Sequence, residues 1–184
     1  MDFKDALLDI KSDMIEKEEV FEAVRRGYSE LSAASDSEIL DYFSASSTEE
    51  MQGHISNVKG ILFEQEVQDK FDANGIDSNI FEQTNHPDSD IQILSDGTII
   101  EELQLKATDS TSYINETLAS NPDIQIIATS EVASSMANEE VINSEISNTV
   151  LEETVSEVLS PIPVSSTGLL FSGAIFLLTG GLWA

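Results

Sequence analysis

The spacing of apolar residues changes abruptly at Asn74-Gly75, and this change limits the possible folds more than any other feature of the chain. Before it, a capping-box pair, Ser47 and Glu50, precedes apolar residues at near-helical spacing. These residues are Met51, Ile55, Val58, Leu62, Val67 and Phe71. After Gly75, apolar residues alternate over short stretches, which is typical of β-strands. The pattern therefore predicts a long helix followed by a sheet.

Three strands and a further helix are expected after this point. Residues 79–83, 90–94 and 98–106 suit strands, and Ser95-Asp96-Gly97 is a hairpin turn sequence because Asp-Gly tolerates positive φ. Residues 110–120 suit a helix that ends at Asn121-Pro122, and 123–129 form a compact apolar strand. The order is helix, three strands, helix, strand. We therefore expect an α/β (α+β) fold.

Helical patterns flank this predicted core on both sides. An amphipathic helix is expected over 3–26, and a short helix is expected after the capping-box pair Ser35 and Glu38. A further helical pattern covers 131–159. We divide the chain into acidic N-terminal helices (1–45), a core (46–130), a helical cover or stalk (131–160) and an apolar tail (161–184).

The apolar tail is a candidate membrane segment. Residues 158–184 carry no charge, and Gly168 to Ala184 is a mostly apolar run of 17 residues, at the lower limit for a bilayer span. It could be a tail anchor, the start of a packed membrane hairpin, or a buried helix. Because the opening residues are acidic and amphipathic, we expect no secretory signal. We expect a cytoplasmic protein that could associate with a membrane through its C-terminus.

The charge balance restricts the choice of partners. The net charge is −27, from 35 acidic and eight basic residues, and no cysteine is present. The absence of cysteine excludes disulfides and thiolate chemistry. The negative field counts against nucleic-acid binding by this chain alone. Two interpretations stay open. The acidic residues could serve solubility in salt, or a basic protein partner, metal ions or a missing segment could supply the attraction for nucleic acid.

Four residues on these elements could form a hydrolytic site. Asp90 opens the second strand, Gln104 and Lys106 share one face of the third, and Glu64 projects from the preceding helix. Hairpin strands lie about 4.8 Å apart, so these side chains can converge. Asp90, Glu64 and Gln104 would be oxygen ligands for Mg²⁺ or Mn²⁺, and Lys106 would orient water or stabilise the transition state.

Two other acidic residues are rivals for the metal-ligand positions. Asp88 would share the face of Asp90, and Glu102 would share the face of Gln104, because side chains alternate along a strand. The spacing excludes neither residue. The ligand set therefore stays open between these two carboxylates and the three proposed ligands Asp90, Glu64 and Gln104.

These residues also carry a family resemblance. The segments GILFEQEVQDKFDANGID, HPDSDIQI and EELQLKAT together resemble the PD-(D/E)XK nuclease superfamily, and within it the Mrr-type restriction endonucleases. Gly60, Phe63 and Glu64 match the helical G-x-x-F-E element, Asp90 matches the aspartate, and Gln104 with Lys106 match Q-x-K. The resemblance covers about 80 of the 184 residues. It implies a restriction-endonuclease-like αβββαβ core and metal-dependent hydrolysis of DNA, in defence or in conflict between bacteria.

A second hypothesis belongs to another class of protein. A non-catalytic interaction protein could keep a degenerate nuclease fold, bind a basic partner through its acidic surface and be tethered to a membrane by the apolar tail. DNA cleavage with a divalent cation separates the two hypotheses.

Overall fold

The computed structural model describes residues 3–7, 15–81, 89–136 and 138–160. This part of the chain contains seven α-helices, one 3-10 helix and five strands. They follow in the order α1 (Phe3–Leu7), α2 (Lys17–Gly27), η1 (Ser29–Leu31), α3 (Asp36–Ser44), α4 (Thr48–Ala73), β1 (Ser78–Ile80), β2 (Ile91–Ser95), β3 (Thr98–Lys106), α5 (Thr111–Ser120), β4 (Gln125–Ala128), α6 (Ser130–Ser135), β5 (Val141–Asn143) and α7 (Asn148–Leu159). The fold is mixed α/β.

The described strands form one mixed sheet in the order β1-β2-β3-β4-β5. β1, β2 and β3 are antiparallel neighbours, whereas β4 and β5 each lie parallel to the preceding strand. Parallel neighbours need crossover connections, and α5 and α6 supply them. Ile91 of β2 pairs with Leu103 of β3, which fixes the register next to the candidate site.

Local sequence signals account for α4 and for the β2–β3 hairpin. Ser47 and Glu50 form the predicted capping box, and the chain leaves α4 at Gly75 with φ of 70°. In the hairpin, Asp96 and Gly97 have φ of 51° and 74°, the positive values that a two-residue turn requires. The predicted order of elements from 48 to 128 is confirmed, and β3 has the predicted bounds.

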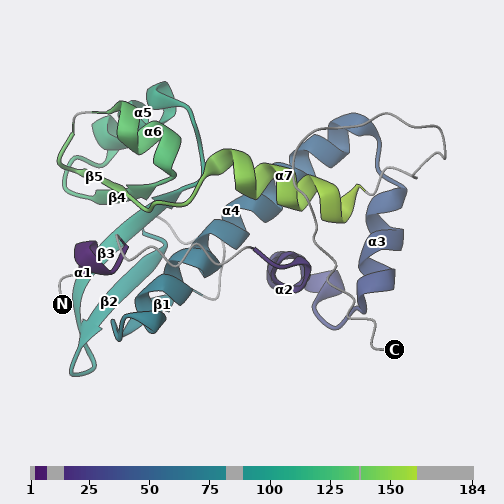
Figure 1. Ribbon diagram of the computed structural model, residues 1–184, viewed down its shortest axis with the longest axis horizontal. Helices are drawn as coiled ribbons and strands as arrows, with labels where there is room; N and C mark the ends of the chain where they lie inside the picture. The colour runs from purple at the N-terminus through teal and green to yellow at the C-terminus, as the bar shows by residue number, and fades with distance from the viewer. Residues whose placement is uncertain (1–2, 8–14, 82–88, 137, 161–184) are drawn as a thin grey trace, which may run out of the picture.

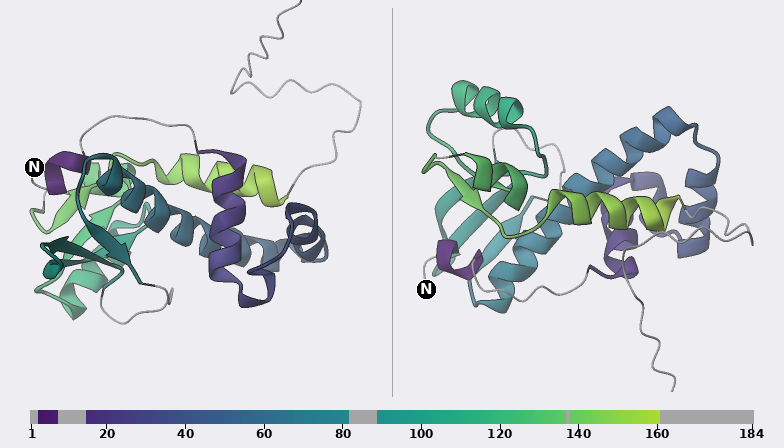
Figure 2. Two further views of the ribbon diagram at one scale, coloured as in Figure 1. Left: turned by 90° about the horizontal axis from the view of Figure 1, so that it is seen from below. Right: turned by 45° about the horizontal axis from the view of Figure 1, so that its top comes forward.

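Two apolar layers cover the two faces of the sheet. On one face, α4 packs against residues such as Ile91 and Leu103, and α1, α2 and α7 extend the same core around α4. On the other face, α5 and α6 pack against Ile126 of β4 through Ile114 and Val132 (Figure 1). The views in Figure 2 show α5 and α6 together at the end of the molecule that holds the sheet, with α3 at the other end. The sheet therefore has helices on both faces, and α5 and α6 lie over its β4 side.

Two helix predictions in the flanking segments are wrong in their extent. The stretch 131–159 is not one helical pattern, because β5 interrupts it between α6 and α7. The spacing of six positions from Met136 to Ile142 breaks the helical period, and Ile142 pairs with Ile127 of β4 instead. The helix predicted over 3–26 is also divided, because Glu16 is in an extended conformation and caps α2.

The membrane prediction concerns residues outside the described part. Residues 161–184 lie there, so the proposed tail segment stays a prediction. Among the residues that are described, no helix has the length and apolar character needed to cross a bilayer.

Candidate functional site

The third strand places Gln104 and Lys106 on the face of the sheet that α5 covers. Leu103 and Leu105 are buried in the core around α4, and side chains alternate along the strand. Gln104 pairs in register with Ile126, and Lys106 pairs with Ala128, which both belong to the α5 layer. Lys106 Nζ lies 5.7 Å from the centre of the Tyr113 ring on α5. The two side chains therefore share a face, as predicted.

Asp90 is fixed directly against the backbone of this strand. Its backbone N–H donates to Leu103 O at 2.9 Å, and its carboxylate Oδ2 accepts a hydrogen bond from the backbone N–H of Leu105 at 2.7 Å. Leu105 stands between Gln104 and Lys106 in β3. The carboxylate consequently lies at the point in the sheet from which both side chains project.

Gln104 carries a buried oxygen that lacks a partner. Its Oε1 atom has no hydrogen bond among the described residues and is shielded from solvent. A buried acceptor left unpaired costs about 1–3 kcal/mol, so such atoms point to a missing donor or cation. An amide oxygen is a hard donor of the kind that Mg²⁺ accepts.

Glu64 is on α4, the helix that covers the opposite face of the sheet from Gln104 and Lys106. Its side chain is 13% exposed, and Arg26 Nη2 donates to its Oε2 at 2.8 Å. Burial raises the pKa of Glu64 to about 7, although the charge and the hydrogen bond of Arg26 oppose this rise. Asp90 also raises the pKa, and Lys106 lowers it. Glu64 therefore lies within the electrostatic reach of both predicted site residues.

The oxygen donors near this strand are of the types that a hard divalent cation accepts. Within the residues that the structure describes, no group of three or more His, Asp or Glu side chains is arranged to hold a metal ion. Glu64 and Asp90 supply two carboxylates, and Gln104 adds the unpaired amide oxygen. Mg²⁺ commonly binds through one or two carboxylates and completes its shell with water and substrate phosphate. Glu64, Asp90 and Gln104 would supply the protein ligands of such a site.

The two rival ligands have different positions. Asp88 belongs to residues 82–88, outside the described part of the chain. Glu102 is exposed on β3, where its Oε1 accepts a hydrogen bond from Gln92 Nε2 at 2.8 Å. Glu102 is two residues from Gln104, which places it about 7 Å further along the strand.

Sequence reasoning missed Arg26. This residue is in the last turn of α2, 38 residues before Glu64, and no local pattern links the two. The nearest signal was the pair Arg25-Arg26 at the end of an acidic helix, which indicates only favourable charge at a helix C-terminus.

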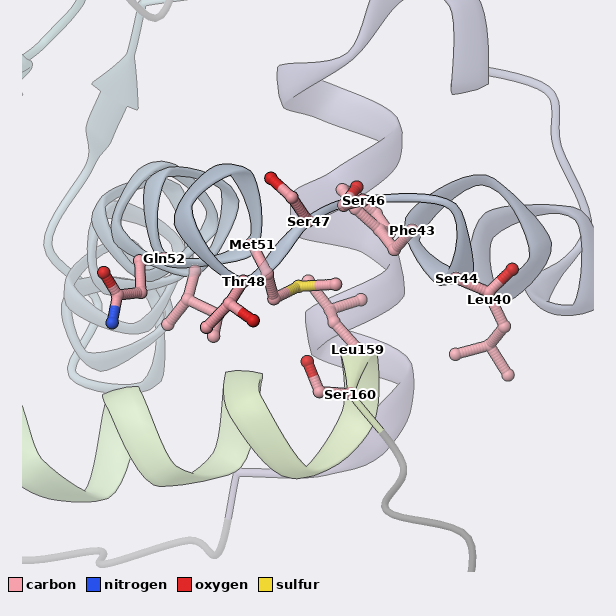
Figure 3. Close-up of a pocket in the computed structure, with 11 residues that line it drawn as sticks. Leu40, Phe43, Ser44, Ser46, Ser47, Thr48, Met51, Gln52, Leu159 and Ser160 are labelled. Atoms are coloured by element: carbon pink, nitrogen blue, oxygen red, sulfur yellow. The ribbon is translucent and has the colours of Figure 1, made fainter.

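An apolar pocket lies away from these residues. It has a volume of about 580 Å³ and is bounded by α3, the start of α4 and the end of α7 (Figure 3). Leu40, Phe43, Met51 and Leu159 supply apolar surface, and none of the lining residues is ionisable. The pocket lining therefore offers no carboxylate, imidazole or amine for acid–base catalysis.

No protein-family model, curated protein or solved structure matches the chain.

Proposed function

We propose that this chain is a metal-dependent endonuclease-like protein that hydrolyses DNA phosphodiesters. Glu64, Asp90 and Gln104 would hold Mg²⁺ or Mn²⁺, and Lys106 would act beside them on the substrate. The observation that carries the proposal is the hydrogen bond from the Leu105 N–H to Asp90 Oδ2. This bond holds the carboxylate against the strand backbone between Gln104 and Lys106.

Each side chain has a role that follows from its chemistry. A bound divalent cation would polarise the phosphate as a Lewis acid. Asp90 is pre-positioned by the strand backbone, and Gln104 offers an oxygen with no competing partner. The Lys106 ammonium can hold a water molecule or stabilise negative charge that develops on the phosphate oxygens.

The order of elements supports a restriction-endonuclease-like core. From α4 to β4 the chain has one helix, three antiparallel strands, a crossover helix and a parallel strand. This is the αβββαβ order that the resemblance to PD-(D/E)XK nucleases implies. Glu64 is on α4, Asp90 directly precedes β2, and Gln104 and Lys106 are on β3, which supports the match to the motif order that the resemblance implies.

A second candidate function is non-catalytic binding by a degenerate nuclease fold. The observation that favours it is the ion pair between Arg26 and Glu64, which occupies one proposed ligand, in a chain of net charge −27. Such a protein would use its acidic surface for a basic partner. Membrane tethering through residues 161–184 is an additional part of this proposal.

The test is cleavage of supercoiled plasmid by the purified full chain with Mg²⁺ or Mn²⁺ at several salt concentrations. We expect nicking by the wild type and at least about a hundredfold loss in Lys106→Ala, the loss typical of removing a transition-state donor. Lys17→Ala on α2 removes the same charge from an exposed position and serves as the control. Absence of cleavage by the wild type under all conditions would favour the non-catalytic function.

A further inference from the structure

One guanidinium nitrogen of Arg26 has no hydrogen-bond partner in the described part of the structure. Its Nη2 atom donates to Glu64 Oε2 at 2.8 Å and to Phe81 O at 3.0 Å. Its Nη1 atom is shielded from solvent and has no hydrogen-bond partner among the described residues. The side chain as a whole is 18% exposed. A buried cationic donor is therefore left unpaired beside Glu64.

An unpaired guanidinium donor indicates a missing anionic acceptor. Leaving a buried charged donor without a partner is unfavourable, and the planar fork of arginine fits carboxylate and phosphate oxygens. Glu64 already occupies Nη2, so Nη1 of the same planar group remains for a second acceptor. In a site for phosphodiester hydrolysis, that acceptor is a phosphate oxygen.

The distribution of positive charge supports this assignment. A chain with net charge −27 repels DNA at long range, so the phosphate needs cations within the site. Most of the other described basic side chains contact groups outside the proposed site. Arg25 pairs with Glu18 and Asp36, Lys59 with Glu152, Lys70 donates to Leu7 O and Ser144 O, and Lys4 and Lys17 lie over Phe3 and Phe21.

The two basic side chains that act on Glu64 are Arg26 and Lys106. We propose that Arg26 is a substrate-binding residue that holds a nonbridging oxygen of the DNA phosphodiester through Nη1 while Nη2 keeps Glu64 in place. This inference rests on the proposed function and deepens it. It assigns part of the substrate affinity to a residue outside the three sequence motifs.

DNA binding by the full chain tests this role. The probe is a fluorescein-labelled DNA duplex, and its anisotropy is measured with Ca²⁺ in place of Mg²⁺. We expect Arg26→Gln to raise the Kd about 10- to 100-fold, the range for a lost charge-assisted hydrogen bond, and to reduce the salt dependence by about one phosphate contact. Arg26→Lys should recover part of the affinity.

The adjacent arginine provides a matched control. Arg25→Gln changes the same charge on the same helix, and Arg25 pairs with Glu18 and Asp36, away from Glu64. We expect its Kd to stay within about threefold of wild type, since its surface ion pairs contribute little. In the single variant Arg26→Gln, the Glu64 carboxylate loses its ion-pair partner. The double variant Arg26→Gln/Glu64→Gln removes this unpaired carboxylate. Thermal unfolding verifies that each variant is folded.

The possible outcomes separate the inference from the proposed function. Equal Kd values and equal salt slopes for Arg26→Gln and Arg25→Gln would overturn the role of Arg26, even if the wild type cleaves plasmid. Arg26-dependent binding without cleavage would support the role of Arg26 and contradict hydrolysis. A wild type that neither binds nor cleaves DNA would overturn both.

Discussion

At the residue scale, Glu64 shows how burial and charge compete within this site. Burial raises its pKa to about 7 from an ordinary value near 4.5, and Arg26 only partly offsets the rise. The folded chain therefore binds a proton at Glu64 that the unfolded chain releases between these two values. Ionised Glu64 is therefore unfavourable in the fold even beside Arg26, and a further cation would stabilise it.

We expect Glu64→Gln to gain stability relative to the wild type as pH rises. The folded pKa is raised, so the stability that the protonated carboxyl provides is complete below the unfolded pKa and is lost as pH rises through about 7. Between about pH 5 and pH 8 the difference in unfolding free energy should change by about 2 kcal/mol in favour of the variant. Urea unfolding at both pH values measures this difference.

Glu49→Gln, which is exposed on the same helix, is the control for Glu64→Gln. Its stability relative to the wild type should not depend on pH over the same interval. An equal pH dependence in the two variants would contradict the burial of an ionisable Glu64.

The candidate residues differ in how far sequence could predict them. Gln104 and Lys106 share a face because of strand alternation, which is a local rule. Asp90 was predicted as a site residue from its position at the start of the second predicted strand. Arg26 could not be found, because its contact with Glu64 depends on how α2 packs against α4. Residues joined by local periodicity were predictable, and a residue joined by helix packing was not.

At the element scale, α2 and α4 show opposite requirements for glycine. A Cβ atom at Gly27 would collide with Ile61 Cδ1, and Ile61 is buried. A Cβ atom at Gly53 would meet no atom within 4 Å. Gly27 therefore permits close packing of α2 on α4, whereas Gly53 has no such role.

Alanine at these two glycines should change stability in opposite directions. Gly27→Ala should destabilise the fold by about 1–3 kcal/mol, because Ile61 must move within a packed core. Gly53→Ala should stabilise it by about 0.5–1 kcal/mol through higher helix propensity. Chemical denaturation of the two variants measures both changes, and stabilisation by Gly27→Ala would show that the packing of α2 on α4 is wrong.

Glu131 of α6 caps the N-terminus of α7. Its carboxylate accepts hydrogen bonds from Ser147 Oγ at 2.6 Å and from the backbone N–H groups of Asn148 and Thr149 at 2.8 and 3.1 Å. Burial alone would raise its pKa, but these hydrogen bonds outweigh burial and lower the pKa to about 2. The depressed pKa means that ionised Glu131 stabilises the fold above about pH 4.5 and that this contribution is lost as pH falls toward 2.

We expect Glu131→Gln to lower the unfolding free energy by about 1–2 kcal/mol at neutral pH, the contribution of charge-assisted hydrogen bonds. The difference from the wild type should shrink as pH falls below about 4.5. Glu153→Gln, exposed on α7, should change stability much less. A pH-independent loss in Glu131→Gln would contradict the capping role.

Sequence predicted the elements that depend on local signals and missed those set by pairing. The capping boxes before α3 and α4 and the Asp96-Gly97 turn were all visible in the chain. β5 was not, because only three residues form it and its pairing with β4 determines its conformation. A short edge strand has too little periodic signal to compete with the helical patterns around it.

At the scale of the whole molecule, the net negative charge disfavours the DNA binding that the proposed site requires. A chain of net charge −27 repels DNA. The proposed site residues are nevertheless on neighbouring segments: Glu64 on α4, Asp90 directly before β2, and Gln104 with Lys106 on β3. A divalent cation would reduce the local negative charge and attract phosphate. Asp90 and its neighbours would therefore form one specific cation site within a generally acidic chain.

Manganese binding, followed by electron paramagnetic resonance of free Mn²⁺ at about 0.15 M salt to screen diffuse binding, tests this claim most directly. We expect one high-affinity ion in the wild type and at least about a tenfold weaker affinity in Asp90→Asn, because a charged ligand is lost. Asp96→Asn, in the exposed hairpin turn, should leave that ion unchanged. Identical Mn²⁺ binding by the wild type and Asp90→Asn would contradict the proposed site.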